Sequence, residues 1–227
     1  MPSYQDLSVK QKEALQSIWW DFLQLFGVTC VATDDDRIHR IRHRLIILWI
    51  TNFPDEEWTA KVAAAFARMD PLDYSNYNCS LGWGIQRFRT LIGVRALDNE
   101  AFSDKYALSK DLQTRRDKLK GLIGPTWWRF IHAFTVYAPP TESAAVMESR
   151  RQFILHWLIV LPCATCVTHA DHLPLAILDK NATCLQNKNH TLSWEFYSIH
   201  NTVNKQIGKE EFTRDAFCYV WNVPKHV

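Results

Sequence analysis

Helical spacing of apolar residues is the feature of this sequence that most narrows its possible folds. Over residues 9–26 and 36–52, large apolar side chains recur every three or four positions, which places them on one face of a helix. These side chains are Leu15, Ile18, Phe22, Leu25, Ile38, Ile41, Leu45 and Trp49. We see no convincing alternation of the kind that predicts a half-buried strand. We therefore predict an all-α fold, with further helices over about residues 55–69, 84–95, 103–119, 125–138, 143–160, 163–172, 192–207 and 209–222.

The composition supports a globular helical protein and excludes several classes of function. Of the 227 residues, 47 % are hydrophobic and 22 % are charged, so the chain contains enough apolar surface to form a core. The formal charge of +2 is too small to indicate a nucleic-acid-binding protein. The longest apolar run, residues 45–50, is far too short to cross a bilayer. We therefore expect neither a nucleic acid nor a membrane as a partner.

The N-terminus and the cysteines indicate an intracellular protein. Residues 1–15 contain no apolar run of a secretory signal, and they are not the Arg-rich, acid-poor type that enters mitochondria. The cysteines do not resemble the disulfide framework of a small secreted domain. They are Cys30, Cys79, Cys163, Cys166, Cys184 and Cys218. We expect the protein to remain inside the cell, in the cytoplasm or nucleus.

A polar run over residues 111–121 ends in glycine, and we place a domain boundary there. The sequence predicts an N-terminal helical domain over residues 1–120 and a second domain over 121–227. No internal repeat is apparent by eye. The first domain is either a degenerate second copy of the C-terminal bundle, serving as a built-in dimer partner, or a separate binding module.

The motif Cys163-Ala-Thr-Cys166 is the first candidate for chemistry. It follows Pro162, which is typical of the first turn of a helix. Cysteines three residues apart on that turn share a face and can approach disulfide distance. A helix N-terminus also stabilises a thiolate and lowers the pKa of the outer cysteine. These properties suit a dithiol that exchanges disulfides rapidly.

A metal site or no function at all are the alternatives for this motif. The run continues with His169 and His172, so four ligand types follow one another at three-residue spacing. Each three-residue step turns a helix by about 300°, so the four side chains spread over roughly half its circumference. They cannot all reach one tetrahedral zinc from a single regular helix. A zinc site formed by the two cysteines and one histidine remains an alternative.

Three motifs in the C-terminal half, taken together, carry a family resemblance. The first extends from Gly124-Pro-Thr-Trp-Trp128 to His132 and Tyr137, and the second is Cys163-Ala-Thr-Cys166-Val-Thr-His169. The third is His200-Asn201-Thr-Val203-Asn204, followed by Gly208-Lys209 and Trp221. In this order and spacing, over about residues 121–222, the motifs resemble the Erv/ALR family of flavin-linked sulfhydryl oxidases. Singly, each of these residues is more often part of a core or a solvated surface.

The resemblance implies a small helical bundle that binds FAD and passes electrons from protein dithiols to dioxygen, making hydrogen peroxide. Cys163 would be the exposed catalytic cysteine and Cys166 the one beside the flavin. The other residues that the resemblance implies in FAD binding are Gly124, Trp128, His132, Tyr137, His169, His200, Asn201, Val203, Asn204, Lys209 and Trp221. Among them, His200, Asn201 and Asn204 would line the adenine and ribose, and Lys209 would face the phosphates. The family also favours a homodimer.

The sequence departs from the family in two respects. Tyr197 and Arg214 occupy positions where many members have a second, structural disulfide, and a Cys184–Cys218 pair is a hypothetical replacement. No second CxxC is present as an electron shuttle, which leaves Cys30 or Cys79 as candidate relays.

The extra N-terminal region and these departures resemble sulfhydryl oxidases of large DNA viruses, of the baculovirus-like group. Such a protein would act in an infected host cell or be associated with the virion. The rival hypotheses are a non-catalytic helical interaction or virion protein, and a zinc-binding helical module.

Overall fold

The computed structural model describes residues 3–94, 96–160 and 183–223, and within these ranges the chain forms helices and no strand. The α-helices are α1 (Val9–Thr29), α2 (Asp36–Thr51), α3 (Glu56–Phe66), α4 (Ser80–Leu91), α5 (Asn99–Lys105), α6 (Leu112–Tyr137), α7 (Ala144–Ile159), α10 (Thr191–Gln206) and α11 (Arg214–Trp221). Short 3₁₀ turns lie at Tyr4–Asp6, Tyr77–Cys79, Thr183–Gln186 and Lys188–His190. The predicted all-α fold is confirmed. The helix predicted over 163–172 lies outside the described residues.

Helix α6 differs from the prediction. We expected two helical stretches, over 103–119 and 125–138, separated at Gly121. Instead, one helix of 26 residues passes through Gly121 and contains Pro125 in its interior. Proline removes one backbone hydrogen bond but does not always end a helix when packing holds both sides. Here Leu119 and Trp127 are both buried, on either side of the proline. The predicted break was therefore wrong.

Most of the other helices begin where a polar side chain caps the first backbone N–H groups. Asp55 accepts a hydrogen bond from Trp58 N at 3.0 Å, and Thr213 accepts one from Ala216 N at 3.2 Å. Such caps satisfy donors that have no partner within the helix. Further caps of this kind are Ser8, Asp35, Asp98 and Asp111.

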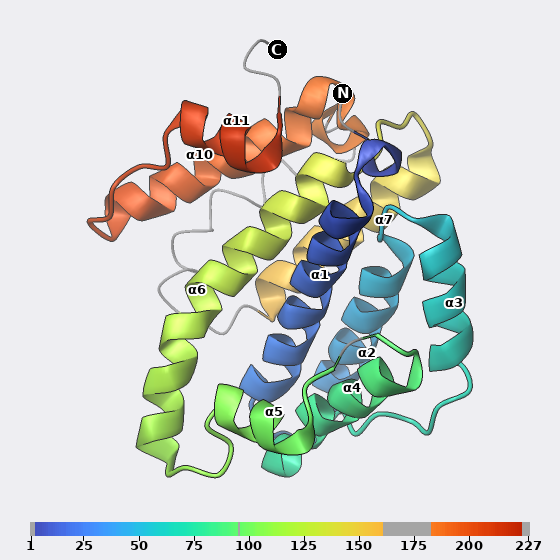
Figure 1. Ribbon diagram of the computed structural model, residues 1–227, viewed down its shortest axis with the longest axis vertical. Helices are drawn as coiled ribbons and strands as arrows, with labels where there is room; N and C mark the ends of the chain where they lie inside the picture. Colours follow the sequence, from blue (N-terminus) through green and yellow to red (C-terminus); the bar gives the residue numbers. More distant parts are fainter. Residues whose placement is uncertain (1–2, 95, 161–182, 224–227) are drawn as a thin grey trace.

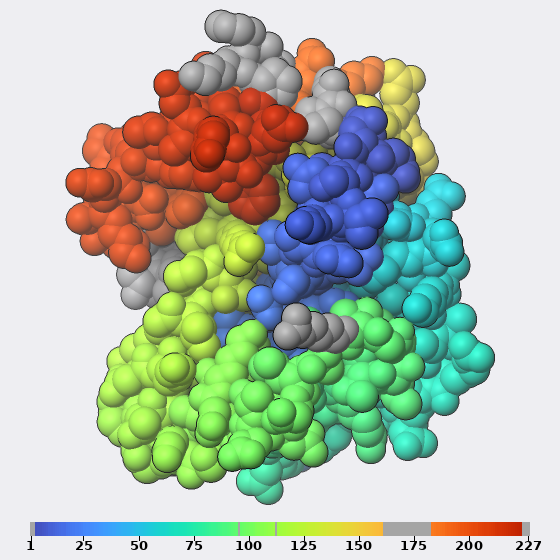
Figure 2. Space-filling model, viewed as in Figure 1, coloured from blue at the N-terminus to red at the C-terminus, as the bar shows by residue number. Residues whose placement is uncertain are grey.

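The centre of the molecule is the pair α1 and α6, which lie side by side and run in opposite directions (Figure 1). Helix α4 packs on α1, α10 packs on α6, and α2 packs on α7. On the face shown in Figure 2, α10 and α11 gather at one end (red), and α4, α5 and the start of α6 at the other (green). We call α1–α5 the N-terminal half and α6–α11 the C-terminal half.

The two central helices carry the same pattern of large side chains. Helix α1 contains Trp19-Trp20-Asp-Phe22, and α6 contains Trp127-Trp128-Arg-Phe130. The pattern continues with a second phenylalanine and a valine at matching spacing in both helices, Phe26 and Val28 in α1 and Phe134 and Val136 in α6. Of these ten side chains, nine are almost completely buried and Trp128 is half-buried.

Hydrogen bonds outside the helices repeat at the matching positions. Arg42 in α2 donates to the carbonyls of Val31 and Tyr74, and Arg150 in α7 donates to those of Pro139 and Leu185. Each arginine thus joins the loop before its own helix to a distant segment of the same half.

The turns before α4 and α10 also match. Asn76 and Asn187 both adopt a left-handed backbone, which asparagine tolerates better than most residues. The Oδ1 atom of each accepts a hydrogen bond from the backbone N–H of a leucine five residues later, Leu81 at 2.9 Å and Leu192 at 3.2 Å. The Nδ2 atom of each then donates to carbonyls at the end of its own central helix.

The contact between the halves is reciprocal. Trp19 meets Phe130 edge to face at 4.7 Å, and Phe22 meets Trp127 edge to face at 4.9 Å. Phe22 and Phe130 stack on each other with ring centroids 3.9 Å apart. Because matching residues exchange partners, the halves are related by an approximate two-fold axis near these phenylalanines. The two halves therefore match in pattern and in contacts, although no repeat is apparent by eye in the sequence. The division at residues 120 and 121 stays a prediction, since α6 crosses it.

Candidate functional site

A cleft of about 720 Å³ lies between α6 and the helices α10 and α11. This volume is in the range of pockets that hold small molecules and cofactors. The cleft is lined by Lys120, Ile123, Gly124, Pro125, Trp128, Arg129, His132, His200, Val203, Asn204, Ile207, Lys209, Phe212, Val220 and Trp221. Eight of the residues implied by the family resemblance are brought together here: Gly124, Trp128, His132, His200, Val203, Asn204, Lys209 and Trp221.

One face of α6 forms a wall of the cleft. Lys120, Gly124, Trp128 and His132 follow one another at four-residue spacing, so successive side chains lie nearly above each other on the helix. His132 is 2 % exposed and lies at the floor. Trp128 is half-buried nearer the opening. The continuous helix through Gly121 therefore extends the wall as far as Lys120.

Helix α10 and the turn after it form the facing wall. The helix ends at Gln206, and Gly208 adopts a positive φ of 70°, which glycine allows without steric cost. Lys209 N then donates to Asn204 O at 2.8 Å, closing the helix end. This turn reverses the chain and places Lys209 on the same cleft as His200 and Asn204.

Four aromatic rings meet in the cleft. The rings of Trp128 and His200 stack with centroids 4.0 Å apart and an interplanar angle of 6°. His132 Nε2 and His200 Nδ1 are 2.8 Å apart, so one nitrogen donates a hydrogen bond and the other accepts it. Trp221 from α11 lies 6.0 Å from His132, ring to ring. The arrangement presents flat, largely apolar surfaces with few polar atoms.

Both histidines of the cleft are held neutral. Burial, with the neighbouring His200 as the smaller cause, lowers the pKa of His132 to about 3. Burial, followed by the charge of Lys209, lowers the pKa of His200 to about 4. Each imidazole is therefore uncharged near neutral pH and can both donate and accept one hydrogen bond.

Asn201 does not line the cleft, in contrast to the expectation from the resemblance. It follows His200 directly, so its side chain points about 100° around the helix. Its amide instead clamps the backbone of Phe212: Nδ2 donates to Phe212 O at 2.9 Å, and Phe212 N donates to Oδ1 at 2.8 Å. Asn201 therefore acts on the cleft indirectly, by fixing the segment that carries Phe212.

Tyr137 is also absent from the cleft. It is the last residue of α6, nine residues beyond Trp128, which is about 13 Å along the helix axis. It lines a different cavity, of about 320 Å³, together with Pro139, Asn187 and His190. Tyr137 therefore lies on a cavity other than the cleft, and its role in cofactor binding stays a prediction.

Sequence reasoning missed seven residues of the cleft: Lys120, Ile123, Pro125, Arg129, Ile207, Phe212 and Val220. The α6 members of this set could have been found by following the helical face of Trp128 and His132 backward in steps of three and four. Phe212 and Val220 had no such signal, because loop and helix packing places them. Lys120, Arg129 and Lys209 give the cleft three cationic side chains.

The residues present fit a flat cofactor that carries phosphate groups. The stacked Trp128 and His200 offer planar surfaces for a ring system, and the three cations suit phosphates. His132 Nδ1 is buried and has no hydrogen-bond partner among the described residues. A ligand atom or a water molecule would supply the missing hydrogen bond. FAD, the cofactor that the resemblance implies, has these parts.

The predicted catalytic residues Cys163 and Cys166, and also His169, lie outside the described residues. The remaining four cysteines, Cys30, Cys79, Cys184 and Cys218, are free thiols, so the hypothetical Cys184–Cys218 bond is absent from the structure. Within the described ranges, no three His, Cys, Asp or Glu side chains group as metal ligands. No helix in those ranges is both long and apolar enough to cross a membrane.

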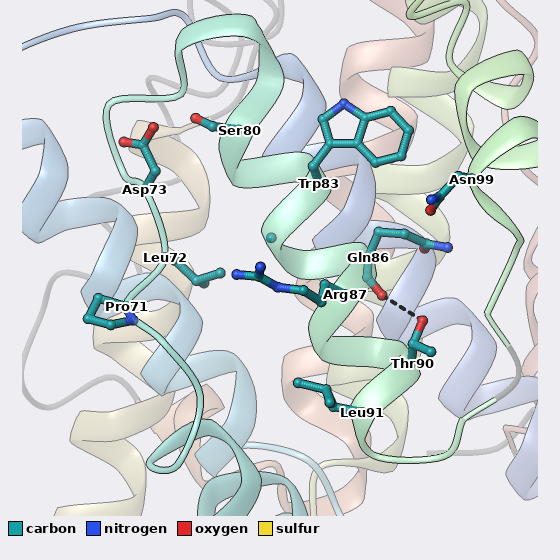
Figure 3. A pocket seen from close by; sticks show the side chains of 11 residues that line it. Pro71, Leu72, Asp73, Ser80, Trp83, Gln86, Arg87, Thr90, Leu91 and Asn99 are labelled. Carbon is teal, nitrogen blue, oxygen red and sulfur yellow. Dashed lines mark hydrogen bonds between the residues drawn. The ribbon is translucent and has the colours of Figure 1, made fainter.

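Another cavity, of about 610 Å³, lies in the N-terminal half between α4 and residues 71–73 (Figure 3). Figure 3 shows Arg87 pointing toward Leu72, and Trp83 and Gln86, which also line the cavity, pointing away from Leu72. None of the residues predicted for the functional site lines this cavity. The cleft on α6 and α10 is therefore the site to which the sequence motifs lead.

Comparison with known proteins identifies a family that spans most of the C-terminal half. The model of the Erv1 / Alr family matches residues 125–222. An FAD-linked sulfhydryl oxidase of African swine fever virus is 32 % identical over 87 residues, which are 38 % of this chain and 69 % of the relative. The protein of the same description from a second isolate is 31 % identical over the same lengths. No solved structure matches the chain significantly.

Proposed function

We propose that this chain, which belongs to the Erv1 / Alr family, is an FAD-dependent sulfhydryl oxidase that forms disulfide bonds in other proteins. The observation that carries the proposal is the cleft in which the stacked Trp128 and His200, the His132–His200 hydrogen bond and Lys209 converge. These residues come from two separate motifs of the chain. When bound, FAD would accept two electrons from a dithiol and give them to dioxygen, forming hydrogen peroxide.

The described residues would bind and orient this cofactor. Trp128 and His200 supply a stacking surface, and Lys120, Arg129 and Lys209 supply positive charge for the phosphates. Neutral His132 supplies a hydrogen bond from the floor of the cleft. Asn201 holds the Phe212 segment against the cleft through its two backbone hydrogen bonds.

Thiol exchange would take place at Cys163 and Cys166. A substrate thiolate attacks the Cys163 sulfur of the oxidised pair, and a second substrate thiolate resolves the mixed disulfide. The substrate loses two electrons and two protons and becomes a disulfide, while the Cys163–Cys166 pair gains two electrons and two protons and becomes a dithiol. The proposal for these two cysteines rests on the sequence motif and the family, since both lie outside the described residues.

We also propose that the N-terminal half is a degenerate copy of the C-terminal bundle. The matching patterns of α1 and α6, the paired arginines and the reciprocal contacts support this view. In the same register, Asp55 and Trp58 occupy the positions of Cys163 and Cys166, so this copy has no redox pair. Its role would be to cover α6 and α7.

Partners and location remain predictions. Protein dithiols would reach Cys163 directly, because Cys30 and Cys79 are poor relays: Cys79 is buried, and burial raises the pKa of Cys30 to about 12. A homodimer would have to form on a surface other than the faces of α6 and α7 that α1 and α2 cover. We expect the protein to act inside an infected cell or in association with the virion.

The first test is the visible spectrum of the purified protein, followed by oxygen uptake after addition of dithiothreitol. We expect a yellow protein that consumes oxygen and forms hydrogen peroxide. Cys163→Ser and Cys166→Ser should each abolish turnover and leave FAD bound, because neither removes the cleft. Cys184→Ser, the same change at a half-buried cysteine outside the motif, serves as the control and should keep full activity. Full oxidase activity in either Cys163→Ser or Cys166→Ser would refute the assignment.

The same preparation separates the rival hypotheses. A yellow protein that oxidises no thiol would favour a non-catalytic interaction protein. A colourless protein with one zinc per chain, measured by metal analysis, would favour the zinc-binding module at Cys163, Cys166 and one histidine.

A further inference from the structure

A second cavity, of about 580 Å³, occupies the place in the N-terminal half that the cleft occupies in the C-terminal half. It is bounded by α1, α3, α4 and the turn at residues 92–94. Arg89 stands at the position of His200, and Gly93 stands at the position of Asn204. The two cavities therefore lie at matching places in the two halves, and different side chains line them.

Arg89 is a buried cation at this cavity. Its side chain lines the cavity, yet the residue is only 8 % exposed. Nη1 donates to Gln24 Oε1 at 2.9 Å, and the guanidinium lies 5.8 Å from the centre of the Trp20 ring. Nε is buried and has no hydrogen-bond partner among the described residues. A buried guanidinium is costly unless its N–H groups are paired.

Within the described part of the chain, no carboxylate forms an ion pair with Arg89. Asp21 is the acid whose charge acts on Arg89, but its carboxylate is bonded to Lys105 at 2.9 Å. Burial is the larger effect and lowers the pKa of Arg89. The positive charge at the cavity is thus incompletely balanced by the protein itself.

Two further side chains that line the cavity can only donate hydrogen bonds. Trp58, 8 % exposed, lines the cavity, and its indole N–H is buried without a partner in the described residues. Lys61, one turn further along α3, lines the cavity with an exposed side chain. The acid of the cavity, Glu13, is exposed on α1. A donor-rich pocket of this kind suits a ligand with acceptor oxygens and negative charge.

We infer that this cavity of the N-terminal half is a binding site for an oxyanion, a carboxylate or phosphate group held by Arg89 and Lys61. The planar guanidinium of Arg89 can donate to two oxygens of such a group at once. The site has no cysteine in its lining and is distinct from the cleft on α6 and α10. The inference does not rest on the proposed oxidase activity.

The test is the melting temperature of the FAD-saturated protein with inorganic phosphate or with citrate, against sodium chloride at equal ionic strength. Saturation with FAD keeps the cations of the other cleft from binding the probe. At about ten times Kd, either probe should raise the melting temperature by roughly 3–6 °C. An effect of phosphate alone identifies a phosphate ligand, and an effect of citrate alone identifies a carboxylate.

The variants locate the binding. Arg89→Gln and Lys61→Gln should each reduce the shift at least several-fold, and Lys61→Gln covers the case in which Arg89→Gln fails to fold. Arg87→Gln is the matched control, since it makes the same change two residues away, about 200° around α4. Figure 3 shows Arg87 pointing toward Leu72. This control variant should keep the full shift.

Three outcomes would overturn the inference. One is the absence of a shift with both probes in the wild-type protein. Another is an undiminished shift in Lys61→Gln and Arg89→Gln. The third is a shift that disappears in Lys209→Gln instead, because the anion would then lie in the flavin cleft.

Discussion

At the scale of single residues, the His132–His200 pair is the part of the site with the clearest consequence. Two imidazoles share one hydrogen bond at the floor of a cleft, and burial holds both neutral. In the unfolded chain each histidine would have a pKa near 6.5. Below that pH the unfolded chain therefore binds protons that the folded chain does not bind.

The flavin-free protein should consequently lose stability as the pH falls from about 6.5 toward 4. The contribution of His132 to the free energy of unfolding should fall by about 2 kcal/mol between pH 6.5 and 5. This contribution is fully present only above pH 6.5. Urea unfolding at several pH values measures this slope. In His132→Gln, the free energy of unfolding should depend less steeply on pH, because about one proton fewer is taken up on unfolding. An unchanged slope in that variant would mean that His132 is charged in the fold.

Residue identities at the site could be predicted in part from the sequence. Trp128, His132 and His200 were found because helical spacing and a family motif both indicate them. The contacts of Asn201 could not be predicted, because the motif does not reveal that the backbone of Phe212, eleven residues later, bonds to its amide. Phe212 was missed for the same reason.

At the scale of helices, two glycines distinguish the N-terminal half from the C-terminal half. A Cβ atom on Gly27 in α1 would lie 2.7 Å from Ile85 Cδ1 and 2.9 Å from Gly82 Cα in α4. The matching residues in α6 and α10 are Thr135 and Ser193, both fully buried. Helices α1 and α4 thus approach each other without side chains at these two positions. Helices α6 and α10 accommodate the side chains of Thr135 and Ser193 there. This difference is consistent with a larger cleft in the C-terminal half.

Gly82→Ala tests this close approach. Its Cβ would lie 2.5 Å from Val28 Cγ1 and 3.2 Å from Val28 N, so α1 and α4 would have to separate. We expect the free energy of unfolding to fall by about 1–3 kcal/mol, measured by chemical denaturation. Gly121→Ala in α6 is the control, because a Cβ there meets nothing within 4 Å. It should stabilise the protein by about 0.5–1 kcal/mol. Equal effects of the two changes would contradict the proposed close packing.

Helix positions were largely predictable, because apolar periodicity is a local signal. The continuity of α6 was not, since Gly121 and Pro125 are local signals for an end and the burial of Leu119 and Trp127 overrides them. The left-handed turns at Asn76 and Asn187 could not be predicted either. Their geometry depends on hydrogen bonds to other helices.

At the scale of the whole molecule, the halves share one core through the rings around Phe22 and Phe130. The match between the halves could not be predicted from the sequence, because few of their side chains are identical. The shared core is visible only when the reciprocal contacts are known.

We expect one cooperative thermal transition in which helix loss and FAD release coincide. Phe102→Ala provides the sharpest test, because Phe102 is fully buried in the N-terminal half against Trp83 and Tyr106. The change should cost about 3–5 kcal/mol and lower the temperature of FAD release as well as that of helix loss. Circular dichroism and flavin fluorescence measure the two events. FAD release at the wild-type temperature, with early loss of part of the helices, would show that the halves unfold independently.

The approximate two-fold contact between α1 and α6 is made within one polypeptide. An interface between two separate chains dissociates when the protein is diluted, and any activity that requires the interface is then lost. Linked halves face each other at an effective concentration fixed by the connecting segment, which dilution does not change. The surface that Phe22 covers on Phe130 should thus stay covered in a single copy of the chain, even where very few copies are present.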